Sequence, residues 1–272
     1  RWLVISTARM PATLINTDMM TAAAQFTEAM GFQFDGILSD SGNLEDFLSD
    51  HLRYFMLAKT RRGGKFGLRP LLPVDANNMV DVEPITPAYV FNEDHIVPDS
   101  FSISYAPLSD RKLICALMLW RQQPDDDIGL IRTTEVRYAG TALDGPYEQH
   151  DLSSFATSEL HAVRIGAYIL AHRRYVTHTL EVRLRPGDWG TTIAAGDLVQ
   201  IQLKRWPSIT TATNHSYYYE VNTIKRSRDG EVSLELTHFP VNDEGQSLVA
   251  IDVMCASASG VMFDTGKGAA IT

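Results

Sequence analysis

Residues 164–175 have the sequence RIGAYILAHRRY, residues 176–185 continue as VTHTLEVRLR, and residues 195–199 are AGDLV. Apolar residues recur on two faces of the first stretch, which predicts a helix covered by other elements over much of its surface. The arginines at its end complement the negative C-terminal end of a helix. Apolar and polar residues alternate in the second stretch, as in a half-buried strand. A helix inserted among strands therefore decides the fold class, which is α+β.

The pattern around this helix is mainly that of strands. Ser158 is placed to cap the helix, which we expect to end at Arg174. The pair Asp229-Gly230 predicts a tight hairpin turn late in the chain. Seven strands are predicted, at 101–105, 112–120, 133–138, 177–185, 198–204, 217–225 and 231–238. For residues 101–240 we therefore expect a mainly antiparallel β barrel or sandwich, with the helix 158–174 flanking it.

The first 72 residues have a different pattern, that of a small α/β domain. We expect a helix from Asp18 to Met30, capped by Asp18, and a second one starting near Asn43. Two strands, 54–60 and 65–72, then flank a turn at 61–64 whose glycines supply positive φ angles. Prolines interrupt residues 73–100, which predicts a linker with short edge strands. Residues 241–272 are expected to be a C-terminal extension or a linker to a further domain, with one strand at 248–254.

Composition describes a folded globular chain. It has 272 residues, of which 44% are hydrophobic and 21% charged, and a formal net charge of −9. This charge argues against a general binder of nucleic acid or anionic membranes, which needs a cationic face. No run approaches the roughly 18 apolar residues of a membrane helix. Cys115 and Cys255 are expected to be free thiols. The abrupt ends suggest a piece of a longer polypeptide.

Metal and catalytic patterns are weak. Asp125, Asp126 and Asp127 lack the spacing of a calcium loop and predict a solvated turn. Four histidines show no metal-ligand spacing: His150, His161, His172 and His178. No serine-nucleophile motif is present. We therefore assign no catalytic, cofactor-binding or metal-binding residue and expect no cofactor.

Other polar clusters have simple structural interpretations. Glu45, Asp46 and Asp50 could suggest a glycosidase, but Asp46 and Asp50 would share one exposed helix face. Residues 61–65 are basic and glycine-rich without the spacing of a phosphate loop, so a hairpin tip is favoured. Arg173 and Arg174 are expected to complement their own helix end. Tyr217, Tyr218 and Tyr219 could stack on nucleic acid, but they alternate between the two faces of a strand.

Several short segments, taken in order, resemble the tail-tip attachment and central baseplate-hub proteins of long-tailed bacteriophages. The resemblance covers residues 10–240, and the individual motifs are short. They are Phe34-Asp35-Gly36-Ile37-Leu38, Gly64-Lys65-Phe66-Gly67-Leu68, Phe91-Asn92-Glu93-Asp94-His95-Ile96-Val97 with Ser100-Phe101-Ser102-Ile103, Ser109-Asp110-Arg111-Lys112-Leu113-Ile114, the basic helix, and Gly196-Asp197-Leu198-Val199. Leu113 stands where the family often has asparagine.

The resemblance implies a non-enzymatic structural hub at the distal end of the tail in the virion. It implies a homotrimer in which tail-tube-like barrels extend or close the tube. The implied partners are the tail tube, distal tail proteins, the tape-measure protein and tail fibres, with DNA passing transiently through the lumen. Two alternatives remain open at this point: a tail-associated peptidoglycan hydrolase, and an oligonucleotide- or carbohydrate-binding β-barrel module.

Overall fold

The computed structural model describes residues 11–36, 43–107, 115–122, 130–141, 145–203, 216–256 and 260–262. The fold is α+β, with sheets that are mainly antiparallel and helices beside them, which confirms the predicted class. The chain forms two compact units: residues 1–82, 112–172 and 248–272 make up the first, and residues 83–111 and 173–247 the second. The strands within 101–240 are thus divided between two units, and helix α3 (Glu159–Tyr175) runs from one into the other.

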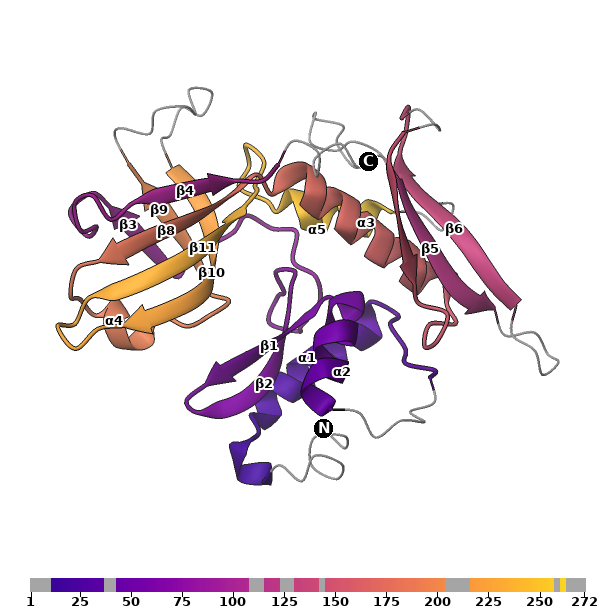
Figure 1. Ribbon diagram of the computed structural model, residues 1–272, viewed down its shortest axis with the longest axis horizontal. Helices are drawn as coiled ribbons and strands as arrows, with labels where there is room; N and C mark the ends of the chain where they lie inside the picture. The colour runs from indigo at the N-terminus through magenta and orange to yellow at the C-terminus, as the bar shows by residue number, and fades with distance from the viewer. Residues whose placement is uncertain are drawn as a thin grey trace. The chain divides into compact units, whose positions relative to one another are not determined.

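The second unit contains a six-stranded sheet (Figure 1). Its strands, in spatial order, are β3 (Tyr89–Asn92), β9 (Leu198–Gln202), β10 (Ser216–Arg226), β11 (Val232–Phe239), β8 (His178–Leu184) and β4 (Ser102–Tyr105). Apolar and charged residues alternate along β8, so its side chains divide between two faces of the sheet. Leu180, Val182 and Leu184 are buried, whereas Glu181 and Arg183 are exposed. The buried faces of the strands form one hydrophobic core, joined by Ile193 of the turn after the short helix α4 (Trp189–Thr192).

This sheet does not close into a barrel within the described residues. β3 pairs with β9 in parallel, while Ile96 forms a bridge to Leu184 and β4 pairs with β8. One segment, 89–105, therefore lies along both edges of the sheet, although β3 and β4 do not pair with each other. The predicted barrel is therefore an open sheet.

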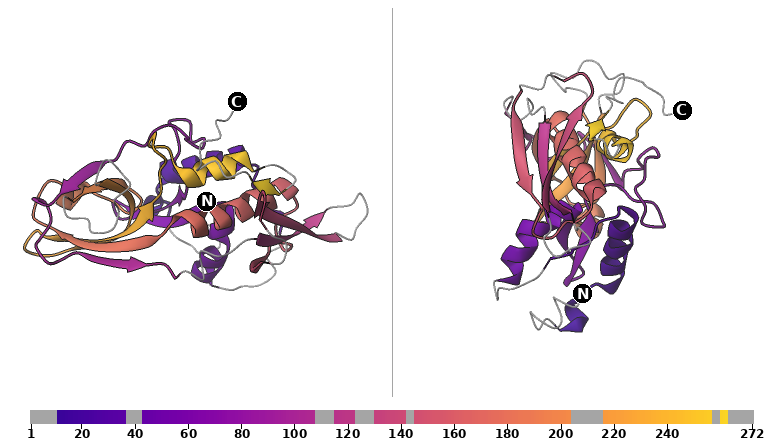
Figure 2. Two further views of the ribbon diagram at one scale, coloured as in Figure 1. Left: turned by 90° about the horizontal axis from the view of Figure 1, so that it is seen from above. Right: turned by 90° about the vertical axis from the view of Figure 1, so that its right-hand side faces the viewer.

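The first unit contains a four-stranded sheet in the order β12 (Val261–Met262), β6 (Leu130–Tyr138), β5 (Cys115–Gln122) and β7 (Tyr147–Asp151). β5 and β6 form one long antiparallel hairpin (Figure 2). Met118 and Val136 on its buried face contact α3 at Gly166. The strand predicted at 248–254 is wrong: these residues form helix α5 (Leu248–Cys255). A short apolar run has no clear period, so tertiary packing decides its conformation.

A buried hydrogen bond joins α5 to this sheet. Tyr138 Oη donates to Asp252 Oδ2 at 2.6 Å, and both side chains are buried. We expect Tyr138→Phe to lower the free energy of unfolding by about 1–2 kcal/mol, because the carboxyl group loses this donor away from water. Urea unfolding measures the change. Tyr147→Phe, at a 63% exposed position, is the control and should change stability little. Equal losses in both variants would contradict the assigned role.

The N-terminal elements follow local rules. Helix α1 (Thr17–Ala29) is capped by Asn16, whose Oδ1 accepts from Met19 N at 3.2 Å, so the predicted cap at Asp18 is wrong by two residues. Helix α2 (Leu44–His51) begins next to Asn43, as expected, and the Asn43 side chain caps it. Two short 3-10 turns, η2 (Ala12–Leu14) and η3 (Leu52–Phe55), precede α1 and follow α2, respectively. The predicted hairpin is confirmed as β1 (Leu57–Arg62) and β2 (Lys65–Pro70).

Candidate functional site

The segment Phe34-Asp35-Gly36 docks against the loop before α3. The rings of Phe34 and Phe155 stack with centroids 5.8 Å apart, and Asp35 N donates to Phe155 O at 2.8 Å. Thr157 Oγ1 donates to the Asp35 carboxylate. A Cβ at Gly36 would lie 2.9 Å from the carbonyl oxygen of Ser154, so glycine permits this approach. These contacts give the motif a packing role.

The stretch 164–175 also acts through packing. A Cβ added at Gly166 would lie 2.6 Å from Val136 Cγ2 and 3.1 Å from Met118 Cγ, so the missing side chain lets α3 approach the sheet closely. Arg164 Nη1 donates to the carbonyl oxygen of Met30 at 2.8 Å. Arg173 and Arg174, at the end of the helix, are half-buried, and the guanidinium of Arg174 lies 5.6 Å from the ring centre of Tyr175.

The Gly196-Asp197 turn, in the second unit, is the third family-like segment with a structural role. Gly196 has φ +94°, in the region that favours glycine. Its N donates to Val221 O at 2.7 Å, and Asp197 Oδ2 accepts from Ala194 N at 2.7 Å. The turn therefore aligns β9 with β10. The segment 109–114, with its Ser109-Asp110-Arg111 motif, lies outside the described residues.

The histidines that the structure describes do not gather into a metal site. No group of three or more His, Cys, Asp or Glu side chains in the described ranges could hold an ion. His161 is buried in the first unit, with Nε2 donating to Tyr54 O at 2.7 Å and burial lowering its pKa. His172 is exposed on α3. His178 belongs to the second unit, and the acidic residues 125–127 lie in an undescribed segment.

His178 forms a polar network at one end of the six-stranded sheet. Its Nε2 lies 2.8 Å from Tyr219 Oη, and its Nδ1 lies 2.7 Å from Thr177 Oγ1. Its ring stacks on His238 at 4.6 Å between centroids, with Tyr105 and Tyr217 also in ring contact. Burial lowers the pKa of His178 to about 4. The neutral ring is thus built into this end of the sheet.

This depressed pKa predicts a loss of stability in mild acid. The unfolded chain takes up a proton near pH 6.5, and the folded chain does so only near pH 4. The free energy of unfolding should therefore fall as pH drops through this window, by at most about 1.4 kcal/mol per pH unit from this residue. Urea midpoints at pH 7, 5.5 and 4.5 test this. His178→Gln should show a shallower dependence, and an unchanged slope would contradict the prediction.

The basic and acidic clusters in the first unit lie on exposed surface. Glu45 forms an ion pair with Lys59 of β1, whose hydrogen bond and charge lower the pKa of the carboxyl group. Asp46 and Asp50 are exposed on α2, as expected for a solvated face. Gly63 and Gly64 have φ +59° and +76°, which confirms the hairpin tip. Cys115 is buried, with a pKa raised to about 11 by burial, and Cys255 is half-buried; both are free thiols, as predicted.

Two of the three tyrosines of β10 face the core of the six-stranded sheet. Tyr219 is fully buried in the hydrophobic core and Tyr217 packs against it. Tyr218 points to the opposite face, as strand alternation requires. Exposure of Tyr217 or Tyr219 would favour an oligonucleotide-binding surface, and Tyr219 is not exposed.

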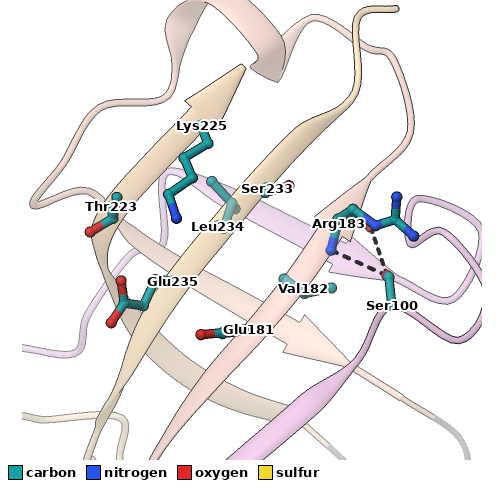
Figure 3. A pocket seen from close by; sticks show the side chains of 9 residues that line it. All are labelled: Ser100, Glu181, Val182, Arg183, Thr223, Lys225, Ser233, Leu234 and Glu235. Carbon is teal, nitrogen blue, oxygen red and sulfur yellow. Dashed lines mark hydrogen bonds between the residues drawn. The ribbon is translucent and has the colours of Figure 1, made fainter. Parts of the chain in front are cut away.

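A groove of about 300 Å³ lies on the outer face of the six-stranded sheet (Figure 3). Glu181 and Glu235 lie directly opposite each other on β8 and β11, with Lys225 and Arg183 beside them. Ser100 Oγ accepts from Arg183 N at 3.2 Å. The sequence alone gives Glu181, Glu235 and Lys225 no functional signal beyond their outward position on alternating strands. The two opposed carboxylates stand in one cross-strand row and Lys225 and Arg183 in the next, on either side of Ser233, so the groove is lined mainly by polar side chains and has no assigned chemistry.

No known family profile matches the chain. No curated protein sequence matches it either. Among solved structures it is similar to a protein in the virion of the native gene transfer agent particle, at 13% identity and a TM-score of 0.48, over 88% of this chain and 52% of that one. It is also similar to a tail protein from Neisseria meningitidis MC58, at 12% identity and a TM-score of 0.48, over 80% and 66% of the two chains.

A third similar structure is a prophage tail protein from Listeria monocytogenes EGD-e, at 9% identity and a TM-score of 0.40, over 72% of this chain and 53% of that one. The chain thus spans between half and two thirds of the length of these proteins. At these scores the likeness is partial and assigns no role. Within the described ranges, no helix has the length and apolarity to span a bilayer.

Proposed function

We propose that this chain is a structural hub component of a bacteriophage tail tip or baseplate. The observation that carries the proposal is the ordered series of segments that resemble this protein family, together with their positions in the fold. Phe34-Asp35-Gly36, Gly166 and Gly196-Asp197 each hold two elements together. In an enzyme, motif residues meet at a reactive cleft. Here they are distributed over packing contacts in both units.

The proposed role includes a homotrimer at the distal end of the tail. The partners would be the tail tube, neighbouring distal tail proteins, the tape-measure protein and tail fibres. The net charge of −9 suits a protein past which DNA moves, because a negative surface does not retain phosphate backbones. A DNA-facing surface lined mainly with lysine and arginine would bind phosphate groups and would contradict this interpretation of the charge.

Disruption of the coding sequence in the particle that carries it tests the role. We expect particles without tails, or tails without their distal end, in negative-stain electron micrographs, and restoration by the wild-type chain supplied in trans. Complete tails that attach normally but fail to degrade the cell wall would contradict the hub and support the hydrolase. Complete, fully infectious particles would contradict both.

A further inference from the structure

His161, in the first turn of α3, is a buried histidine with only one of its two ring nitrogens paired. Its Nε2 lies 2.7 Å from Tyr54 O, and because a carbonyl oxygen only accepts, Nε2 carries the proton and Nδ1 is a bare acceptor. The side chain is 0% exposed, and Nδ1 has no hydrogen-bond partner within the described part of the chain. Buried polar atoms almost always have a partner, so this nitrogen needs an explanation.

Aromatic rings from three segments lie around His161. Phe32, which follows α1, stacks on it with ring centroids 4.4 Å apart. The ring centroid of Phe55, in the turn η3, lies 5.1 Å from that of His161, and the centroid of Phe155, in the loop before α3, lies 6.3 Å from it. Together with the hydrogen bond to Tyr54, these contacts make His161 a point at which η3 and the segment after α1 meet α3.

The charged groups of the neighbouring elements are held by other contacts. Asp35 lies on the same segment as Phe32, and its carboxylate accepts from Thr157 Oγ1. Burial lowers the pKa of His161, although the hydrogen bond to Tyr54 and the negative charge of Asp35 oppose this effect. The other titratable side chains on these elements are Glu159 with Thr134 Oγ1, Arg164 with Met30 O, His51 with Phe47 O, Arg53 with Tyr54 Oη, Arg121 with Asp35 O, His150 with Glu148, Asp151 with Ser153, and the exposed Asp46 and Asp50. None of the described contacts brings an acceptor to Nδ1.

We propose that His161 is an acid-sensitive switch that releases η3 and the segment after α1 from α3. Protonation adds an N–H and a positive charge at Nδ1, where no described group accepts a hydrogen bond. The faces of the aromatic rings attract a cation, but this attraction is smaller than the cost of burying an unpaired charge. Opening the contact brings water to the charged ring and thus removes that cost. It also exposes Phe32 and Phe155, which are 5% and 2% exposed in the closed contact.

The direction of the pH dependence follows from where the proton binds. With the contact open, the histidine takes up a proton near pH 6.5, whereas the pKa of His161 in the closed contact is lower. The open form is therefore favoured by up to about tenfold for each pH unit below 6.5, until the pKa of the closed contact is reached. His178 lies in the second unit, so its titration acts on a different hydrophobic core.

Hydrogen exchange followed by mass spectrometry from pH 7 to pH 5 tests the switch in the full chain. Asp35 N donates to Phe155 O at 2.8 Å, so peptides that cover residues 32–36 and 52–56 report the opening. Corrected for the intrinsic rate, exchange in the wild type should rise by up to about tenfold per pH unit. His161→Gln retains a donor for Tyr54 O but cannot titrate, so its corrected exchange should depend little on pH.

His172→Gln is the matched control, because His172 is exposed on the same helix. This variant should show the pH dependence of the wild type. An undiminished pH dependence in His161→Gln would overturn the proposal. Loss of the pH dependence in His51→Gln would overturn it as well, because the titrating group would then lie on α2.

Nuclear magnetic resonance of the histidine rings in the wild type tests the proposal even if His161→Gln misfolds. The His161 ring, assigned through its contact with Phe32, should show the neutral tautomer protonated at Nε2 and a pKa below 6.5. A pKa at or above this value, or a proton on Nδ1 in the neutral ring, would contradict the switch. The inference depends on the packing of the first unit alone, so it stands or falls separately from the tail role.

Discussion

Phe155→Ala is expected to lower the free energy of unfolding by about 3–5 kcal/mol, the largest effect we predict for one side chain. Phe155 is 2% exposed and its ring contacts four aromatic residues of the first unit within 6.0 Å. They are Phe34, His51, Tyr54 and Phe55. Truncation leaves a cavity where the segment before α3 meets α2 and η3, and these rigid rings cannot collapse into it.

Phe34→Ala is the matched control for this substitution. Phe34 stacks on Phe155 but is 40% exposed, so its truncation removes less buried area and should cost about 1–2 kcal/mol. Urea unfolding followed by the fluorescence of Trp120, which lies in the same unit, measures both variants. If Phe155→Ala is no more destabilising than Phe34→Ala, this aromatic cluster does not stabilise the unit.

Gly166→Ala should destabilise the chain by about 2 kcal/mol. The added methyl group would lie 2.6 Å from Val136 Cγ2 and 2.9 Å from Val136 Cβ, closer than packed carbons allow. Overpacking of this kind costs up to about 3 kcal/mol. Alanine recovers about 1 kcal/mol through its higher helix propensity, which leaves a net loss. An ordinary glycine-to-alanine substitution inside a helix raises the free energy of unfolding, whereas this one is expected to lower it.

Gly190→Ala provides the comparison within the same chain. Its nearest contact would be Val232 Cγ2 at 3.6 Å, an ordinary van der Waals distance, and Gly190 also lies in a helix, α4. We expect this variant to be as stable as the wild type or slightly more stable. Differential scanning calorimetry of both variants separates the two cases. A stabilised Gly166→Ala would show that α3 can move away from the sheet without cost.

Local physical chemistry was enough to predict many elements. Asn43 caps its helix because its short side chain reaches the free N–H of Glu45, and Gly63-Gly64 turn because glycine tolerates positive φ. The helix at 158–174 lies within one residue of the prediction at each end. Each of these features depends on residues a few positions apart, so a single sequence contains the necessary information. The misplaced cap at Asp18 shows the limit, since Asn16 supplies the same chemistry two residues earlier.

The candidate surface could not be predicted from the sequence. The groove around Glu181 and Glu235 depends on β8 and β11 pairing in one particular register, although these residues are far apart in the chain. In contrast, the residue types of Phe34-Asp35-Gly36 already favour a packing role. Phenylalanine and glycine side chains have no group that could act as an acid, a base or a nucleophile.

The sequence by itself determined the α+β class, the principal helix and the hairpins, since periodicity, caps and turn residues act over short distances. Only the tertiary structure decided that residues 248–255 form a helix, that the predicted barrel stays open between β3 and β4, and that its strands belong to two units. These outcomes depend on which distant segments bury their apolar faces together. That choice is a property of the whole packed chain, and no local pattern encodes it.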